Sequence, residues 1–162
     1  MRILARPHQL PARLATGAFI LNSGLTMAAS ARQSAAGIHG MASTAYPFLK
    51  DLDPEKFTRW VATGQIAVGA ALLIPLVPSL LAGAALTAFA GGLIGIYLRT
   101  PGLRKQGSLR PTEEGIGIAK DVWLLGIGTG LVAEELSRDP AGPGLRPGSL
   151  SRTGSVGVHG HR

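Results

Sequence analysis

Four apolar stretches, at 12–30, 58–77, 79–98 and 116–136, constrain this chain more than any other feature of its sequence. A lipid bilayer has a hydrocarbon core about 30 Å thick, which a helix of roughly 20 residues crosses. Each stretch has about that length, and a water-soluble domain of 162 residues is too small to bury all four. The sequence therefore predicts an all-α integral membrane protein, a four-helix bundle surrounded by the lipid bilayer.

Flanking residues set the ends of the predicted helices, which run at about 12–31, 54–76, 79–98 and 113–136. Asp53-Pro54-Glu55 is typical of a helix start, because Asp caps free backbone N–H groups and Glu complements the positive end of the helix dipole. Pro75 and Pro78 interrupt an apolar run and predict a tight helical hairpin there.

Three parts follow from these helices: a basic segment at 1–11, a transmembrane domain at 12–138 and a tail at 139–162. The tail is rich in Gly, Pro, Ser and Arg and has no periodic apolar face, so we expect it to be disordered. Between the first two helices, the sequence predicts a short surface helix around 35–45 and an interfacial aromatic cluster at Tyr46-Pro47-Phe48.

The first apolar stretch has a second interpretation. Basic residues precede it, and Ala29-Ser30-Ala31 matches the cleavage pattern of a secretory signal peptide. Its apolar run from Leu14 to Ala31 is longer than the usual 7–15 or so apolar residues of a signal peptide. Three more apolar stretches follow, so we expect a retained helix and keep cleavage as the alternative.

The net charge of +7 raises the question of nucleic acid as a partner. The basic residues instead stand at the ends of the apolar stretches, as they do where spanning helices meet lipid headgroups. They are Arg13, Arg32, Arg59, Arg99, Arg104, Lys105, Arg110 and Arg138. We therefore expect no nucleic-acid partner, and a cell-membrane protein that crosses the bilayer several times. The N-terminal arginines favour a cytoplasmic position for both termini, although the two long loops carry about as many cations.

Small residues recur at helical spacing, which in lipid favours close contact between helices. Gly83, Gly91 and Gly95 lie along one face of the third predicted helix, and Gly126 and Gly130 form a G-x-x-x-G pattern on the fourth. Packing within the bundle is the favoured interpretation, and a homo-oligomer formed through the same glycines is the alternative.

Polar residues at membrane depth are costly and usually have a partner or a function. Lys120 and Asp121 lie in the fourth apolar stretch, Gln65 in the second and Asn22 in the first. Asp121 is too short to reach the headgroups, so we expect it to contact Asn22, Gln65, Arg59 or water. A structural clamp between helices is the favoured interpretation, and a ligand or proton site formed by these four residues is the alternative.

Catalytic and metal-binding patterns do not emerge from the sequence. The chain has no cysteine, which excludes disulfides and thiolate chemistry, and it has no Ser/His/Asp set or metal-ligand spacing. His159 and His161 in the tail could bind a metal ion only weakly. We expect Glu134-Glu135 to be a solvated helix end. We therefore expect a non-catalytic protein without a metal.

Three segments resemble the DoxX-like family of small four-helix bacterial membrane proteins. They are Phe19-Ile-Leu-Asn-Ser-Gly24-Leu25, Gly64-Gln-Ile-Ala-Val-Gly69-Ala-Ala-Leu-Leu73 and Ala119-Lys-Asp-Val-Trp-Leu-Leu-Gly126. Similar proteins often carry an acidic residue where Gln65 stands and a basic one near Met27, so this chain departs from the pattern at both positions. The resemblance implies association with membrane redox or oxidative-stress systems, sometimes through quinones.

Three functions follow from these observations. The first is a non-catalytic membrane subunit or scaffold that docks a redox-enzyme partner. The second is a quinone- or lipid-binding component of an oxidoreductase, with quinone as the implied cofactor. The third is a small transporter or channel, for which four helices leave little room unless the protein oligomerises.

Overall fold

The computed structural model describes residues 5–137, and these residues form an all-helical structure, as predicted. The predicted tail, with His159 and His161, lies outside the described residues. The only β-type pairing within 5–137 is an isolated antiparallel bridge between Arg104 and Pro111. In chain order the elements are η1 (Pro7–Gln9), α1 (Leu10–Ala29), α2 (Ala31–Ala45), η2 (Pro47–Leu49), α3 (Pro54–Leu73), α4 (Ser79–Arg99), α5 (Ile116–Ala119) and α6 (Val122–Leu136).

Local sequence explains where several of these helices begin and end. The Asp53 side chain accepts a 2.8 Å hydrogen bond from the backbone N–H of Lys56, and Pro54 takes the first position of α3. Residues 74–78, with Pro75 and Pro78, separate α3 from α4. The chain breaks again at Lys120–Asp121, so the segment predicted as one helix consists of α5 and α6.

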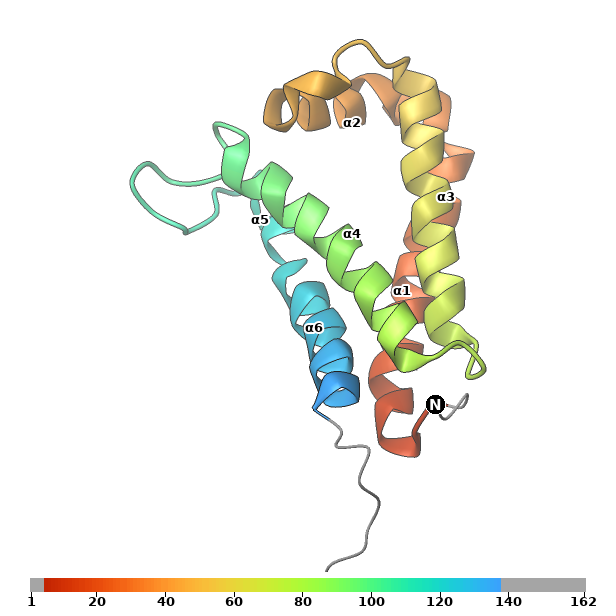
Figure 1. The fold of residues 1–162 in the computed structure, drawn as a ribbon. Coiled ribbons are helices and arrows are strands. Elements are labelled where there is room, and N and C mark those ends of the chain that lie inside the picture. The colour runs from red at the N-terminus through yellow and green to blue at the C-terminus, as the bar shows by residue number, and fades with distance from the viewer. Residues whose placement is uncertain (1–4, 138–162) are drawn as a thin grey trace, which may run out of the picture.

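Two antiparallel pairs of helices build the molecule, α1 with α3 and α4 with α6 (Figure 1). We call the end where α1 begins and α3 turns into α4 the foot, and the opposite end the head. At the head the axes of α1 and α2 differ by 110°, so α2 turns away from α1 and lies across the molecule. Its buried residues are Ala31, Ala35, Ala42 and Ala45, small side chains that let it approach its neighbours closely.

Glycines bring the helices of each pair into close contact. A Cβ atom on Gly69 of α3 would lie 2.6 Å from the backbone nitrogen of Leu21 in α1, and one on Gly128 of α6 would lie 2.8 Å from that of Thr87 in α4. Gly83 packs against α6 in the same way, whereas Gly91, Gly126 and Gly130 face open space within the described residues. The predicted packing role therefore fits Gly83, and the homo-oligomer through the other glycines stays a prediction.

Arg13 corrects one sequence prediction. We expected its guanidinium at the lipid headgroups, but the side chain is fully buried at the foot. Helix α3 ends at Leu73, which leaves its last carbonyl groups without helical partners. Arg13 donates hydrogen bonds of 2.9–3.1 Å to the carbonyls of Ala71, Leu72, Ile74 and Val77 and to the Ser79 hydroxyl. The buried guanidinium supplies hydrogen-bond donors that these carbonyls would lack if the side chain pointed to the surface.

A chain of polar contacts continues from Arg13 across the foot. Ser79 donates to Gln9, and Gln9 donates to Glu134 at 2.7 Å near the end of α6. Glu134 also accepts from Arg6 and contacts His8, both at 2.9 Å. The glutamate predicted as a solvated helix end thus ties the last helix to the start of the first. Because residues 6 and 134 are in contact, the two ends of the described chain lie at the same end of the molecule.

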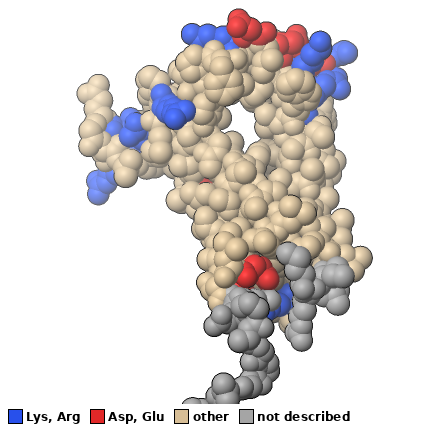
Figure 2. Space-filling model, viewed as in Figure 1, with Lys and Arg blue, Asp and Glu red and all other residues tan. Residues whose placement is uncertain are grey.

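Two segments are long and apolar enough to cross a membrane, α4 and Ile116–Leu136. The α1–α2 pair passes the same criterion only as a bent unit, so the described residues offer two spans, or up to three. Lys, Arg, Asp and Glu gather at the two ends of the molecule and over the segment between α4 and α5, with a broad, mostly uncharged band between (Figure 2). The structure is therefore compatible with a membrane location.

Candidate ligand cavity

An open cavity of about 790 Å³ lies at the head between α2, α3 and α4. Figure 2 shows it as an opening between the two helix pairs. Its walls are mainly apolar, with Met41 from α2, Phe57 and Val61 from α3, and Phe89 and Leu93 from α4. A volume in this range is typical of sites that enclose a drug-sized or cofactor-sized molecule.

The path of α2 creates the cavity. Because α2 turns by 110° away from α1, it covers the space where α3 and α4 diverge. The residues that line the cavity there include Gly37, Ala42, Ala88 and Gly92, whose small side chains leave the space unfilled. The cavity is thus a consequence of helix direction and of side-chain size together.

Tyr46 fastens the far end of α2 to α4. Its hydroxyl donates a 3.1 Å hydrogen bond to the carbonyl of Gly92, and the ring lies under the Arg99 guanidinium at 5.1 Å. A side chain on Gly95 would overlap the Tyr46 hydroxyl, so glycine at this position makes room for the ring. Sequence analysis placed Tyr46 in an interfacial aromatic cluster but gave no signal that it would close a cavity.

Ionic contacts fasten the near end of α2. Glu55, in the first turn of α3, pairs with Arg59 at 2.9 Å and with Arg32 of α2 at 3.3 Å. The hydrogen bond from Arg59, and to a smaller extent the nearby Arg32, lowers the pKa of the Glu55 carboxyl below its ordinary value. Arg59, one of the expected partners of Asp121, is therefore engaged with Glu55.

Gln65 is the polar group that distinguishes this cavity. Its side chain lines the cavity and is 7% exposed, and its Oε1 atom is enclosed without a hydrogen-bond partner among the described residues. An amide offers one acceptor and two donor hydrogens, and leaving such a group buried and unpaired costs about 1–3 kcal/mol. The cavity wall therefore carries a buried amide whose Oε1 atom is shielded from the cavity and unpaired among the described residues.

The other polar side chains that line the cavity are either bonded or exposed. Ser34 donates to the carbonyl of Ser30 at 2.9 Å, and Tyr46 donates to Gly92. Gln33 is exposed. Gln65 is thus the lining residue whose hydrogen-bonding capacity remains open within the described part of the chain.

The four polar residues singled out from the sequence do not come together. Gln65 lines the cavity, whereas Asn22 is exposed on α1 and lines a neighbouring depression, which shares Met27, Ser34 and Ile38 with the cavity. Lys120 is exposed beside another depression, lined by Ile94 and Tyr97 of α4 among others.

Asp121 is half-buried at the break between α5 and α6, next to Lys120. Within residues 5–137 it has no hydrogen bond or ion pair to Asn22, Gln65 or Arg59. The described structure does not bring the four candidate residues into contact, and Gln65 is the candidate that the geometry favours.

Metal binding finds no support in the described residues, where no group of three or more His, Cys, Asp or Glu side chains is placed to hold an ion. His39 instead contacts the carbonyl of Leu49 at 2.9 Å and lies edge-on to Phe57, and His8 contacts Glu134. These histidines serve the packing of α2 and of the foot.

Comparison of the chain with protein-family models, curated proteins and solved structures found no match. The resemblance to the DoxX-like family thus stays a prediction from the three sequence segments, and so does the redox association that it implies.

Proposed function

We propose that this protein is a four-span integral membrane protein that binds a lipophilic molecule in the cavity between α2, α3 and α4. The spans are α1, α3, α4 and the α5–α6 segment, with both ends of the described chain on one side of the bilayer. The observation that carries the binding proposal is the unpaired amide of Gln65 in an otherwise apolar cavity.

The outer faces of the helices support the membrane part of the proposal. Only 28% of the most apolar window of α4, and 17% of that of Ile116–Leu136, is buried inside the molecule. Large apolar side chains such as Phe19, Leu81 and Trp123 are 41–63% exposed on these and neighbouring helices. In water such surfaces cost free energy in proportion to their area, whereas in lipid they are solvated.

The internal placement of polar groups supports α1 and α3 as further spans. The Arg13 charge is turned inward onto carbonyls of α3, so the α1–α3 pair presents no charge from this position to lipid. Gly17, Gly24 and Gly69 allow the close α1–α3 contact that stabilises helix association in bilayers.

The cavity defines the chemistry of the ligand. Its apolar walls favour a molecule that is mostly hydrocarbon or aromatic, and Gln65 favours one polar group that accepts from Nε2, or that donates to Oε1 after the amide turns toward the cavity. A quinol hydroxyl and a quinone carbonyl meet these requirements. The quinone predicted from the family resemblance is therefore one member of the proposed ligand class. No residue of the cavity gives a reason to propose catalysis.

Binding can be tested on the protein purified in mild detergent and reconstituted into lipid nanodiscs. We expect decylubiquinone to bind saturably to the wild type and about tenfold more weakly to Gln65→Leu, since one hydrogen bond is lost. Gln106→Leu is the matched control, because it changes an exposed glutamine outside the cavity. Equal affinities of the wild type and Gln65→Leu would contradict a site at Gln65.

Membrane insertion has its own test. Membranes that contain the protein are washed with alkaline carbonate, which we expect to leave the chain in the pellet. Release into the supernatant would contradict the membrane proposal. The redox-enzyme partner, the transporter alternative and the cytoplasmic position of the termini stay predictions.

A further inference from the structure

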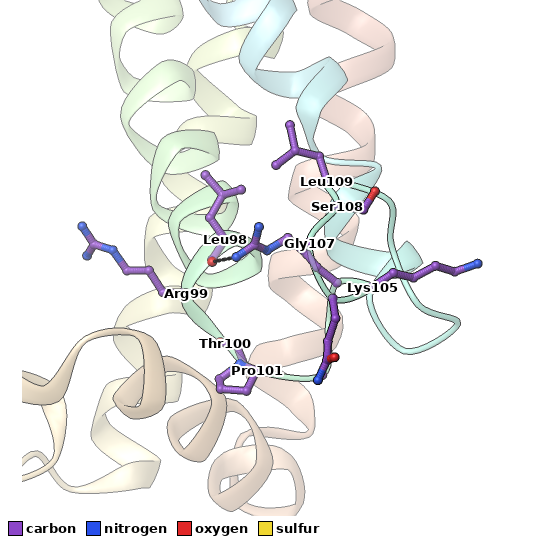
Figure 3. A pocket seen from close by; sticks show the side chains of 11 residues that line it. Leu98, Arg99, Thr100, Pro101, Lys105, Gly107, Ser108 and Leu109 are labelled. Carbon is purple, nitrogen blue, oxygen red and sulfur yellow. Dashed lines mark hydrogen bonds between the residues drawn. The ribbon is translucent and has the colours of Figure 1, made fainter.

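Residues 99–111 follow the head end of α4 and form a folded turn, which we call the basic hairpin (Figure 3). Arg104 and Pro111 form an antiparallel bridge, and the backbone N–H of Lys105 donates to the carbonyl of Arg110 at 2.9 Å. Gly107 has a φ of +70°, in the left-handed region that favours glycine in a turn. The hairpin therefore holds its side chains in a defined arrangement.

Contacts from both sides fix the hairpin on the helices. The Tyr97 hydroxyl of α4 donates to the carbonyl of Leu109 at 2.6 Å, and Thr112 donates to the carbonyl of Gly102 at 2.7 Å. Leu103 is buried, and its carbonyl occupies the space where a side chain on Gly115 would lie. The hairpin is anchored to the protein at its base while its tip is exposed.

Positive charge that takes no part in the ion pairs of the described residues is the distinctive property of the hairpin. It carries Arg99, Arg104, Lys105 and Arg110, and the nearest carboxylates along the chain, Glu113 and Glu114, follow just after it. None of the ion pairs among the described residues includes these four cations. Arg104 turns one nitrogen to the carbonyl of Leu98 at 2.6 Å, while its Nε is enclosed without a partner in the described residues.

Apolar side chains stand beside these cations. Leu109 is 72% exposed and Leu98 40% exposed, and the hairpin surrounds a depression of about 600 Å³ lined by Arg99, Arg104, Lys105 and Ser108 among others. Figure 3 shows these side chains around the turn that follows α4. Exposed leucines next to arginines match a bilayer surface, where acyl chains lie beside charged headgroups.

The other charged region of the head has a different composition. At the α2–α3 corner, Lys50, Lys56 and Arg59 alternate with Asp51, Asp53 and Glu55, and Glu55 pairs with Arg59. The acidic residues of that corner neutralise most of its positive charge. Cations at helix ends are therefore not always left unpaired, and the unpaired cations of the hairpin need another explanation.

We infer that the basic hairpin binds the headgroup of an anionic phospholipid at the bilayer surface. The phosphate lies among Arg104, Lys105 and Arg110, and Leu109 enters the upper acyl region. This inference rests on the membrane part of the proposed function and does not depend on the cavity.

The test uses the absence of cysteine from the chain. Gln106→Cys, at the exposed tip, receives an environment-sensitive fluorophore, and the protein is reconstituted into nanodiscs of phosphatidylcholine with increasing phosphatidylglycerol. We expect a blue shift that grows with phosphatidylglycerol, disappears in high salt and persists in millimolar inorganic phosphate. In the triple variant Arg104→Gln, Lys105→Gln, Arg110→Gln, we expect the shift to be lost at every phosphatidylglycerol content, because about fivefold weaker binding per cation removed multiplies to roughly a hundredfold.

The matched control removes three cations from the α2–α3 corner, Lys50→Gln, Lys56→Gln and Arg59→Gln, and should keep the wild-type response. A shift that is the same without phosphatidylglycerol, that survives in the hairpin variant or that is lost equally in the control overturns the inference. Cancellation by inorganic phosphate also overturns it, because the site would then take a free anion. Release of the labelled protein by alkaline carbonate would overturn the membrane proposal, whereas an inserted protein without lipid preference would overturn the hairpin site alone.

Discussion

The foot and the head of this molecule treat buried polar groups in opposite ways. At the foot, the five donors of a fully buried arginine meet four carbonyls and a hydroxyl, and the contacts continue through Ser79 and Gln9 to Glu134. At the head, Gln65 lies buried beside a cavity of about 790 Å³ with its Oε1 atom unpaired among the described residues. The same chain therefore stabilises the foot through internal hydrogen bonds and leaves at the head a polar group that a ligand can pair with.

The largest effect should come from Arg13. Arg13→Met leaves the carbonyls of Ala71, Leu72, Ile74 and Val77 without their donor, and we expect a loss of about 3–5 kcal/mol in the free energy of unfolding. Thermal unfolding in detergent measures this loss. Arg32→Met, which removes an exposed cation from a surface ion pair, should cost at most about 1 kcal/mol. Equal costs for the two variants would show that the foot is not the stabilising end.

Glycine substitutions extend the comparison to helix packing. Gly69→Ala near the foot places a Cβ atom 2.6 Å from the backbone nitrogen of Leu21, so the helices must separate at a cost of about 1–3 kcal/mol. Gly92 of α4 lines the cavity and has no atom near an added Cβ among the described residues. Gly92→Ala should be neutral or stabilise by up to about 1 kcal/mol, because alanine favours a helix. Unfolding of both variants under one condition decides the question, and a large loss for Gly92→Ala would mean that the head is as closely packed as the foot.

Gln65 gives a smaller effect of opposite sign. Gln65→Leu removes an unpaired buried amide, so the ligand-free protein should become more stable by about 1 kcal/mol while its affinity for decylubiquinone falls. A polar group that serves only to hold helices together would give the reverse, a loss of stability on replacement. Thermal unfolding with and without the quinone separates the two outcomes, with Gln106→Leu, outside the cavity, as the control that changes neither.

Sequence reasoning succeeded where a local pattern determines the result. The all-helical structure follows from long apolar stretches, and the start of α3 from Asp53 and Pro54, because length, capping and proline geometry act within a few residues. Gln65 was singled out on the same basis, as an isolated amide in an apolar stretch, and its role in a ligand site stays a prediction.

Features that depend on contacts between distant segments were not predictable in this way. Arg13 looked like a headgroup residue, because its partners lie about 60 positions away at the end of α3. The turn of α2 across the head places Tyr46 on Gly92, and no spacing in the sequence encodes that contact. Asp121 was expected to contact Asn22, Gln65, Arg59 or water, but it lies at the break between α5 and α6 and has no hydrogen bond to these three residues within the described part of the chain. The cavity could not be predicted from the sequence, because it depends on the directions of the helices.

The smallest effect concerns the ionic contact that holds the near end of α2. The pKa of Glu55 is lower in the folded protein than in the unfolded chain, because Arg59 and Arg32 stabilise the carboxylate. Its contribution is therefore present above the unfolded pKa of about 4.3 and is lost as the pH falls through the lower folded value. We expect the protection of the α2 amides, corrected for the intrinsic pH dependence of hydrogen exchange, to fall slightly in that acidic range, and Glu55→Gln to show the lower protection already at neutral pH. Because Glu55 is solvent-accessible, the change should be small and should weaken further in high salt. If exchange at the foot responded to the same titration, the ionic contact would not be local to the head, and the two ends would be coupled.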